Sequence, residues 1–91
     1  MKRIDFDGIV FREGQTFVAY CPELDVSSCG KSVDEARQNL RIAVRLFLEE
    51  AERMGILEQI LEEAGYIADA SGEYISPRIV LSESMEVRVG D

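Results

Sequence analysis

Histidine is missing from this 91-residue sequence, and cysteine and proline occur only twice each. Without histidine the chain lacks the usual general base, so nucleophilic catalysis by a Ser-His or Cys-His pair is excluded. Cys21 and Cys29 could supply only two ligands of a zinc site, and carboxylates alone would have to complete it. We therefore expect no metal and no other cofactor, and we expect both cysteines to be free, mostly buried thiols.

Long apolar runs are also missing. No stretch approaches the roughly 18 consecutive apolar residues of a membrane span, and residues 1–5 contain no apolar core of a signal peptide. These observations predict a cytoplasmic protein without membrane contact. A length of 91 residues suits one modest hydrophobic core, so we expect residues 1–91 to form a single domain.

Basic residues are scarce: 10 Lys and Arg stand against 18 Asp and Glu, which gives a net charge of −8. Proteins that bind nucleic acids draw much of their affinity from Lys and Arg contacts with phosphates, so this balance argues against direct DNA binding. It favours solubility, and it would also steer a basic protein partner toward the chain. Arg37, Arg41 and Arg45 form a row that Glu49 and Arg53 continue, and we interpret this row as a solvated helix flank.

Three segments early in the chain have the alternating pattern of half-buried strands. Residues 3–12 are expected to form the first strand, with Gly8 at a bulge or bend where the apolar face changes. Residues 16–21 form the second strand and should pair antiparallel with the first as a hairpin. Pro22 cannot donate a ladder hydrogen bond and ends that strand, and residues 24–29 form a short third strand.

One long helix follows the strands. Ser32 and Glu35 form an S-x-x-E capping box, which predicts a helix from residue 33 to about residue 54. Its apolar residues fall on one stripe that should lie on the sheet, namely Val33, Ala36, Leu40, Ala43, Val44, Phe47, Leu48, Ala51 and Met54. Ile42 and Leu46 point away from this stripe, so they are covered by the next helix, are covered by a second copy of the chain, or stay exposed.

The remaining residues predict a short helix, a loop and strands. Residues 56–64 form the short helix, which can pack beside the long one as a helical hairpin. Residues 69–72 form a loop, and residues 78–81 and 85–89 have strand patterns. The predicted fold is therefore α+β, an antiparallel sheet of three N-terminal strands plus a C-terminal strand, packed on one long helix that is followed by a short helix.

The C-terminal strands have little internal sheet left to join. We therefore expect one of them to pair with the sheet edge of another copy, in a dimer or tetramer. Val87 and Val89 would then lie in the oligomer interface, as would the aliphatic pair Ile42 and Leu46.

A set of spaced residues in the first two thirds of the chain resembles a known family. A strand with aromatic residues leads to a corner with the sequence Tyr-Cys-Pro-acidic-Leu. A Cys-Gly pair then precedes the Ser that caps the long helix. Within that amphipathic helix a Glu-Ala pair is followed by an Asn. The residues are Tyr20, Pro22, Glu23, Leu24, Cys29, Gly30, Ser32, Glu35, Ala36 and Asn39. This pattern resembles the HicB-like antitoxin family, as does the stretch 62–66, whereas Asp25 and Val26 stand where the family usually has Pro-Gly.

The resemblance implies a β-β-β-α-β core of partial RNase H-like fold and an antitoxin that binds and neutralises a small basic ribonuclease toxin. Glu23, Asp25, Glu58 and Glu62 would then be the candidate partner-binding residues. Full antitoxins of this family generally carry a C-terminal DNA-binding domain. Residues 66–91 have neither helical periodicity nor a basic cluster, so we expect no operator binding.

Two other functions compete with the antitoxin role. A reduced RNase H-like nuclease would need three or four carboxylates converging on two magnesium ions. Asp5, Asp7, Glu23 and Asp25 are the acids near predicted strands, but nothing in the sequence makes them converge, and we expect no enzyme. The second alternative is a stand-alone oligomeric domain, which is compatible with binding a toxin.

Overall fold

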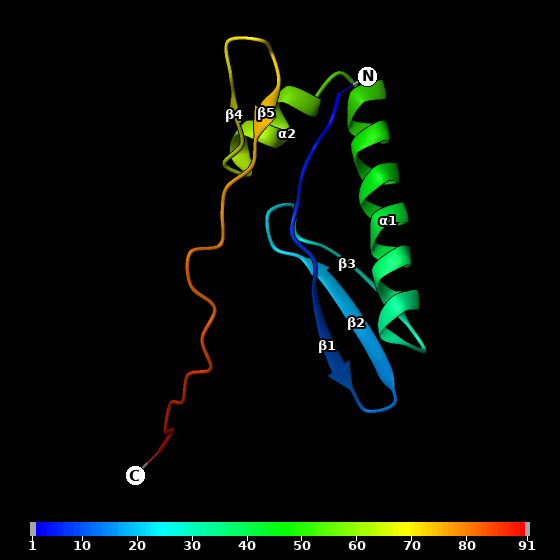
Figure 1. Ribbon diagram of the computed structural model, residues 1–91, viewed down its shortest axis with the longest axis vertical. Coiled ribbons are helices and arrows are strands. Elements are labelled where there is room, and N and C mark those ends of the chain that lie inside the picture. Colours follow the sequence, from blue (N-terminus) through cyan, green and yellow to red (C-terminus); the bar gives the residue numbers. More distant parts are fainter. Residues whose placement is uncertain (1, 91) are drawn as a thin grey trace.

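The computed structural model describes residues 2–90 and shows an α+β fold (Figure 1). Along the chain the elements are β1 (Ile9–Glu13), β2 (Thr16–Cys21), β3 (Val26–Gly30), α1 (Val33–Arg53), α2 (Leu57–Glu63), β4 (Ile67–Ala68) and β5 (Tyr74–Ile75). The fold class and the element order predicted from the sequence are confirmed.

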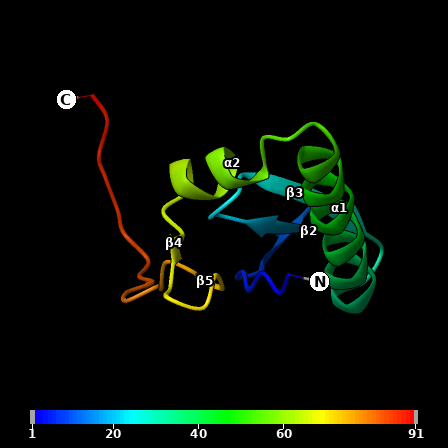
Figure 2. The same cartoon turned by 90° about the horizontal axis from the view of Figure 1, so that it is seen from above.

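The first three strands form one antiparallel sheet with β2 in the centre. Successive side chains of a strand point to opposite faces, and Ala19 and Cys21 of β2 are fully buried. These two residues face α1, which lies along one side of the sheet (Figure 2). Val18 and Tyr20 therefore lie on the other face, which no helix covers in the part of the chain that is described.

Local signals fix both ends of α1. The Glu35 amide donates a hydrogen bond to the Ser32 hydroxyl at 3.0 Å, as the capping box predicts. The Glu35 carboxylate accepts from the amide of Lys31 rather than from that of Ser32, so the return hydrogen bond lies one residue earlier than predicted. At the other end Gly55 has φ of 75°, a left-handed conformation that glycine adopts without strain and that stops the helix.

The core lies where α1, the sheet and α2 meet. Its buried residues are Ala19, Cys21, Leu24, Ala36, Leu40, Val44, Ala51, Leu57, Leu61 and Tyr66. Of the nine residues in the predicted α1 stripe, four are buried in this core and two, Ala43 and Leu48, are half-buried. Val33 and Met54 are exposed because they lie at the two ends of the helix, and Phe47 is exposed although it lies within the stripe.

The predicted first strand is shorter than the sequence suggested. It begins at Ile9 rather than at residue 3, and residues 2–8 have no regular secondary structure. Hydrogen bonds to side chains, and not to a neighbouring strand, hold the backbone of this segment. The Tyr66 hydroxyl donates to the Asp5 carbonyl at 2.6 Å, and the amide of Asp7 donates to the Glu23 carboxylate at 3.1 and 3.2 Å.

The C-terminal strands lie earlier in the chain than predicted. β4 and β5 form a separate two-stranded sheet around the expected loop at residues 69–72, where Asp69 accepts hydrogen bonds from Ser71 and from the amide of Glu73. The strands predicted at residues 78–81 and 85–89 are wrong for this structure, because residues 76–90 form no ladder. An alternating pattern gives a segment one apolar and one polar face, but a strand also needs a neighbouring strand for its backbone hydrogen bonds. This segment runs away from the sheet and has no such neighbour there (Figure 1).

A search for membrane-spanning helices among residues 2–90 finds none that is sufficiently long and apolar.

Candidate protein-interaction surface

Glu23 lies at the corner between β2 and β3 and has a structural role. Its carboxylate accepts hydrogen bonds from the Asp7 amide and from the Cys21 thiol, the latter at 3.4 Å. Burial at this corner raises the pKa of Glu23 above its ordinary value. Its hydrogen bonds point into the protein, so Glu23 is less available to a partner than the sequence suggested.

Asp25 shapes the turn into β3. Its φ of 55° is a left-handed conformation, which Asp tolerates better than most residues. The Tyr20 hydroxyl donates to its carboxylate at 3.0 Å, and this hydrogen bond raises the pKa of Tyr20. Asp25 is exposed, and part of its role is to hold this turn.

Glu58 and Glu62 belong to a longer segment that is rich in exposed acidic residues. Residues 49–63, the end of α1 and all of α2, carry six exposed glutamates: Glu49, Glu50, Glu52, Glu58, Glu62 and Glu63. Arg53 is the one basic residue in this range, so the range has a net charge of −5, out of −8 for the whole chain. We call residues 49–63 the acidic hairpin. Its charge could have been found by summing charges along the predicted helical hairpin.

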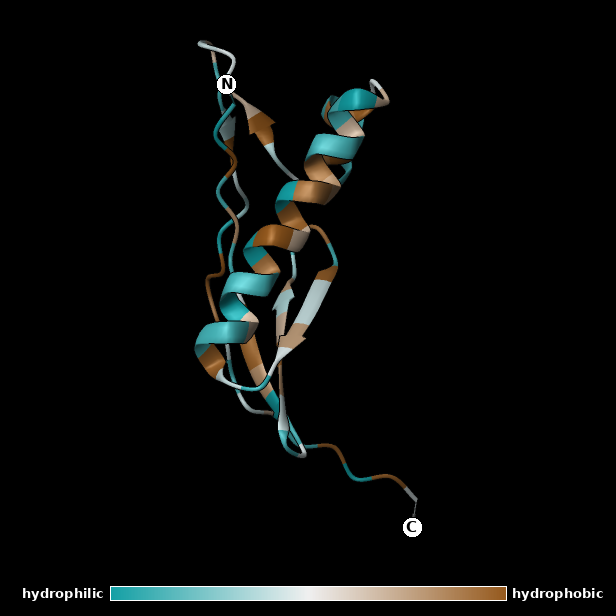
Figure 3. Cartoon of the chain, turned by 90° about the vertical axis from the view of Figure 1, so that its right-hand side faces the viewer, coloured by the Kyte–Doolittle hydropathy of each residue, from teal (hydrophilic) through white to brown (hydrophobic). Residues whose placement is uncertain are grey.

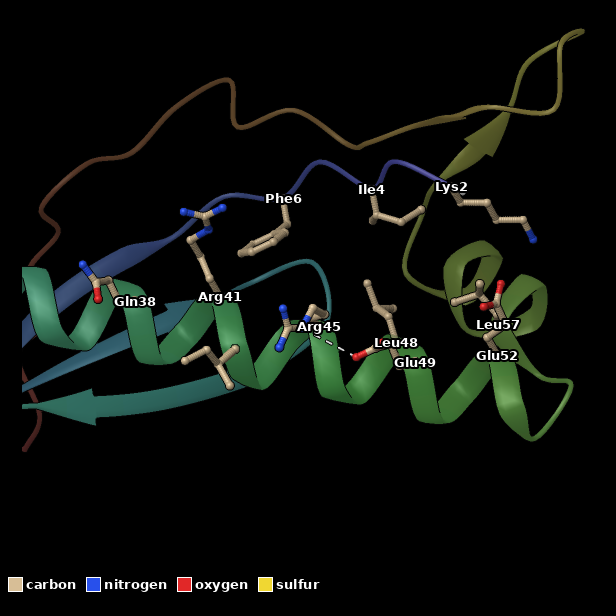
Figure 4. A pocket seen from close by; sticks show the side chains of 11 residues that line it. Lys2, Ile4, Phe6, Gln38, Arg41, Arg45, Leu48, Glu49, Glu52 and Leu57 are labelled. Carbon is tan, nitrogen blue, oxygen red and sulfur yellow. Dashed lines mark ion pairs between the residues drawn. The ribbon is translucent and has the colours of Figure 1, made fainter.

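An open groove of about 920 Å³ runs beside the acidic hairpin, between residues 2–6 and α1 (Figure 4). Ile4 and Phe6 point from the N-terminal segment toward the helix (Figure 4). Leu48 and Leu57 also line it, and its charged residues are Lys2, Arg41, Arg45, Glu49 and Glu52. Arg45 pairs with Glu49 at 3.6 Å. The groove thus combines apolar walls with charges of both signs.

Ile42 and Leu46 remain exposed, at 49% and 56% of their surface. The short helix α2 therefore does not cover them, and the alternative in which it does is wrong. α2 instead directs its buried residues Leu57 and Leu61 into the core.

The four acids considered for a nuclease do not form a metal site. Asp5 pairs with Arg3 at 3.3 Å, while Glu23 and Asp25 are engaged as described above. Among residues 2–90 no group of three or more Cys, Asp or Glu side chains is placed to hold a metal ion. This arrangement gives the nuclease alternative no support.

The two cysteines differ in environment. Cys21 is fully buried, and burial raises the pKa of its thiol to about 11. Cys29 is exposed, contrary to the expectation of two buried thiols. It pairs across the sheet with Val18, and both residues lie on the face that points away from α1.

This difference predicts two rates of thiol labelling. At pH 8 an aromatic disulfide reagent should react within minutes with one thiol of the monomeric chain, and with the second only after denaturant is added, because Cys21 is buried and protonated. Cys29→Ser should remove the fast reaction, and Cys21→Ser should leave it. Rapid modification of two thiols in the native protein would contradict the burial of Cys21.

Comparison of the chain with protein-family models, curated proteins and solved structures finds no match. The candidate site is therefore defined by the chain's own geometry. It consists of the acidic hairpin and of the groove that borders it, with Ile42 at the side of the groove.

Proposed function

We propose that the protein is a HicB-like interaction module that binds and neutralises a small basic protein, a ribonuclease toxin, through the acidic hairpin. The observation that carries this proposal is the concentration of charge: five of the eight net negative charges lie within residues 49–63, and all six glutamates there are exposed. A surface of this kind attracts a basic partner over a Debye length of about 8 Å at physiological salt and raises the association rate.

The groove supports the same proposal, because charge alone gives little affinity. Exposed ion pairs contribute only about 0–1 kcal/mol each, so a stable complex also needs apolar contact. Leu48 and Leu57 line the groove directly beside the glutamates of the hairpin. A partner side chain could therefore enter the groove while basic residues beside it meet Glu49 and Glu52, which line the groove, and others meet Glu58 and Glu62 on α2.

Neutralisation follows from what a ribonuclease must do. Such an enzyme binds RNA through Lys and Arg side chains that contact phosphates. Carboxylates carry the same sign of charge as phosphates. The exposed glutamates of the acidic hairpin can therefore bind those Lys and Arg side chains and exclude the RNA. The proposed antitoxin would then act by competition, and it would need no catalytic residue of its own.

Charge reversal on the hairpin tests this proposal. We would purify any small basic protein that copurifies with the tagged chain and measure RNA cleavage by that protein as the chain is added. Wild-type chain should inhibit at about one to one, and Glu58→Lys with Glu62→Lys should weaken inhibition at least tenfold.

The matched control is Glu73→Lys with Glu83→Lys, which changes the net charge equally at exposed positions outside the hairpin. It should weaken inhibition less than threefold. Equal losses for the two pairs would mean that only overall charge matters, and absence of inhibition by the wild-type chain would overturn the proposal.

A further inference from the structure

Residues 78–90 have the side-chain pattern of a strand but no partner in the structure. Every residue of this segment is exposed, and Val89 exposes 95% of its surface. Hydrophobic and hydrophilic residues follow one another along the C-terminal segment (Figure 3). Met85, Val87 and Val89 alternate with Glu86 and Arg88, so an extended chain places apolar side chains on one face and charged ones on the other. The segment is suited to a half-buried strand at the edge of a sheet.

The sheet has two edge strands, β1 and β3, and β1 is the less occupied of them. β1 pairs with β2 on one side, and among residues 2–90 no backbone hydrogen bond reaches its outer side. The edge at β3 is partly occupied, because the side-chain amide of Asn39 on α1 donates to the Cys29 carbonyl at 2.8 Å. An unpaired strand edge is a template for a further strand, and β1 is the edge that remains for it.

The sheet face next to this edge is apolar and uncovered. Ile9 and Phe11 of β1 lie beside Val18 of β2 on the face away from α1, and Phe11 exposes half of its surface. A strand added to β1 with Met85, Val87 and Val89 on the same side would extend this apolar face. If the segment joined its own β1, the enlarged face would stay in water. A second copy with the same enlarged face can cover it, as two packed sheets do.

Charge also permits two copies to meet here. Each chain carries −8, so most surfaces repel their equivalent. β1 carries Arg12 and Glu13, and residues 78–90 carry two Arg and two Glu, so both regions are neutral. Met85, Val87 and Val89 are 77%, 83% and 95% exposed, so two exchanged segments bring six exposed apolar side chains to the contact, and their removal from water favours association.

We propose that residues 85–89 of one copy add as a strand to the outer edge of β1 of a second copy, and that the exchange is reciprocal. The linking residues 76–84 can span about 30 Å when extended, which gives residues 85–89 a wide reach from the end of β5. This self-association is independent of the proposed toxin binding, because it uses neither the acidic hairpin nor the groove.

Sedimentation of the full chain at micromolar concentration tests the proposal. Wild-type protein should have the mass of a dimer, and Val87→Lys should raise the dissociation constant at least tenfold. The matched variant Glu86→Gln removes one negative charge on the opposite face of the segment, so it changes the net charge by the same amount, and it should change the constant less than threefold. Both positions are exposed and outside all helices and strands, so neither variant should unfold the chain.

Hydrogen exchange then identifies the contact. Amides on the outer side of β1 should be protected in the wild-type dimer and should lose protection in Val87→Lys. A wild-type monomer at all concentrations would overturn the proposal. A monomer in which Val87→Lys lowers the melting temperature would instead place the segment on its own β1, and a dimer that Val87→Lys leaves intact would place the interface elsewhere, with Ile42 and Leu46 as the next candidates.

Discussion

Replacing Gly30 by alanine is expected to lower the free energy of unfolding by about 2–3 kcal/mol, the range of an overpacked core. A Cβ atom at this position would lie 2.7 Å from the backbone nitrogen of Ala36 and 2.9 Å from the backbone carbon of Glu35. These are atoms of the first turn of α1, so no side chain can rotate away to make room. Either β3 or the capped end of the helix must move.

Gly14→Ala is the matched control. Gly14 has φ of 62°, and a Cβ there would meet no atom within 4 Å. Alanine should therefore cost only the strain of the left-handed conformation, about 1–2 kcal/mol. Urea unfolding followed by circular dichroism would measure both. If Gly30→Ala proved no more destabilising than Gly14→Ala, the close contact between β3 and α1 would be wrong.

Leu61→Ala is expected to have the largest effect of any single truncation in the chain, about 3–4 kcal/mol. Leu61 is fully buried and has the largest volume among the side chains buried to this degree. It lies on α2, a helix of seven residues that is too short to be stable without tertiary packing. Its loss should therefore loosen α2 as well as leave a cavity in the core.

Two leucines outside the core serve as controls for the destabilisation expected of Leu61→Ala. Leu81→Ala should change the free energy of unfolding by less than about 0.5 kcal/mol, because Leu81 is 69% exposed in the extended segment. Leu46→Ala, on the outer side of α1, should also cost less than about 1 kcal/mol in the monomer. Thermal or urea unfolding of all three variants would measure the order, and a small effect of Leu61→Ala would contradict the packing of α2.

Much of the fold could be predicted because its signals are local. The Ser32 cap and the Gly55 terminator lie next to the helix that they delimit, and the predicted end of α1 differs from the observed one by about a residue. The alternation in β2 likewise depends only on neighbouring residues. Element order and fold class follow from such signals without any knowledge of tertiary contacts.

The remaining features depend on residues far apart in the chain. The backbone of residues 5–7 is held by Glu23 and Tyr66, so a strand pattern there does not become a strand. The exposure of Cys29 depends on which sheet face α1 covers. In the candidate site, Glu58 and Glu62 were identified from the sequence, whereas the groove required the position of the N-terminal segment beside α1.

The hydrogen bond from Tyr66 to Asp5 has a consequence for the newly made chain. The two residues are 61 positions apart, and a ribosome adds about 5–20 residues per second. Roughly 3–12 s therefore pass between the synthesis of Asp5 and that of its partner. During this interval the first hairpin has neither α2 nor Tyr66 to hold the segment before it, and its open edge is available to chaperones or to other nascent chains on the same messenger RNA.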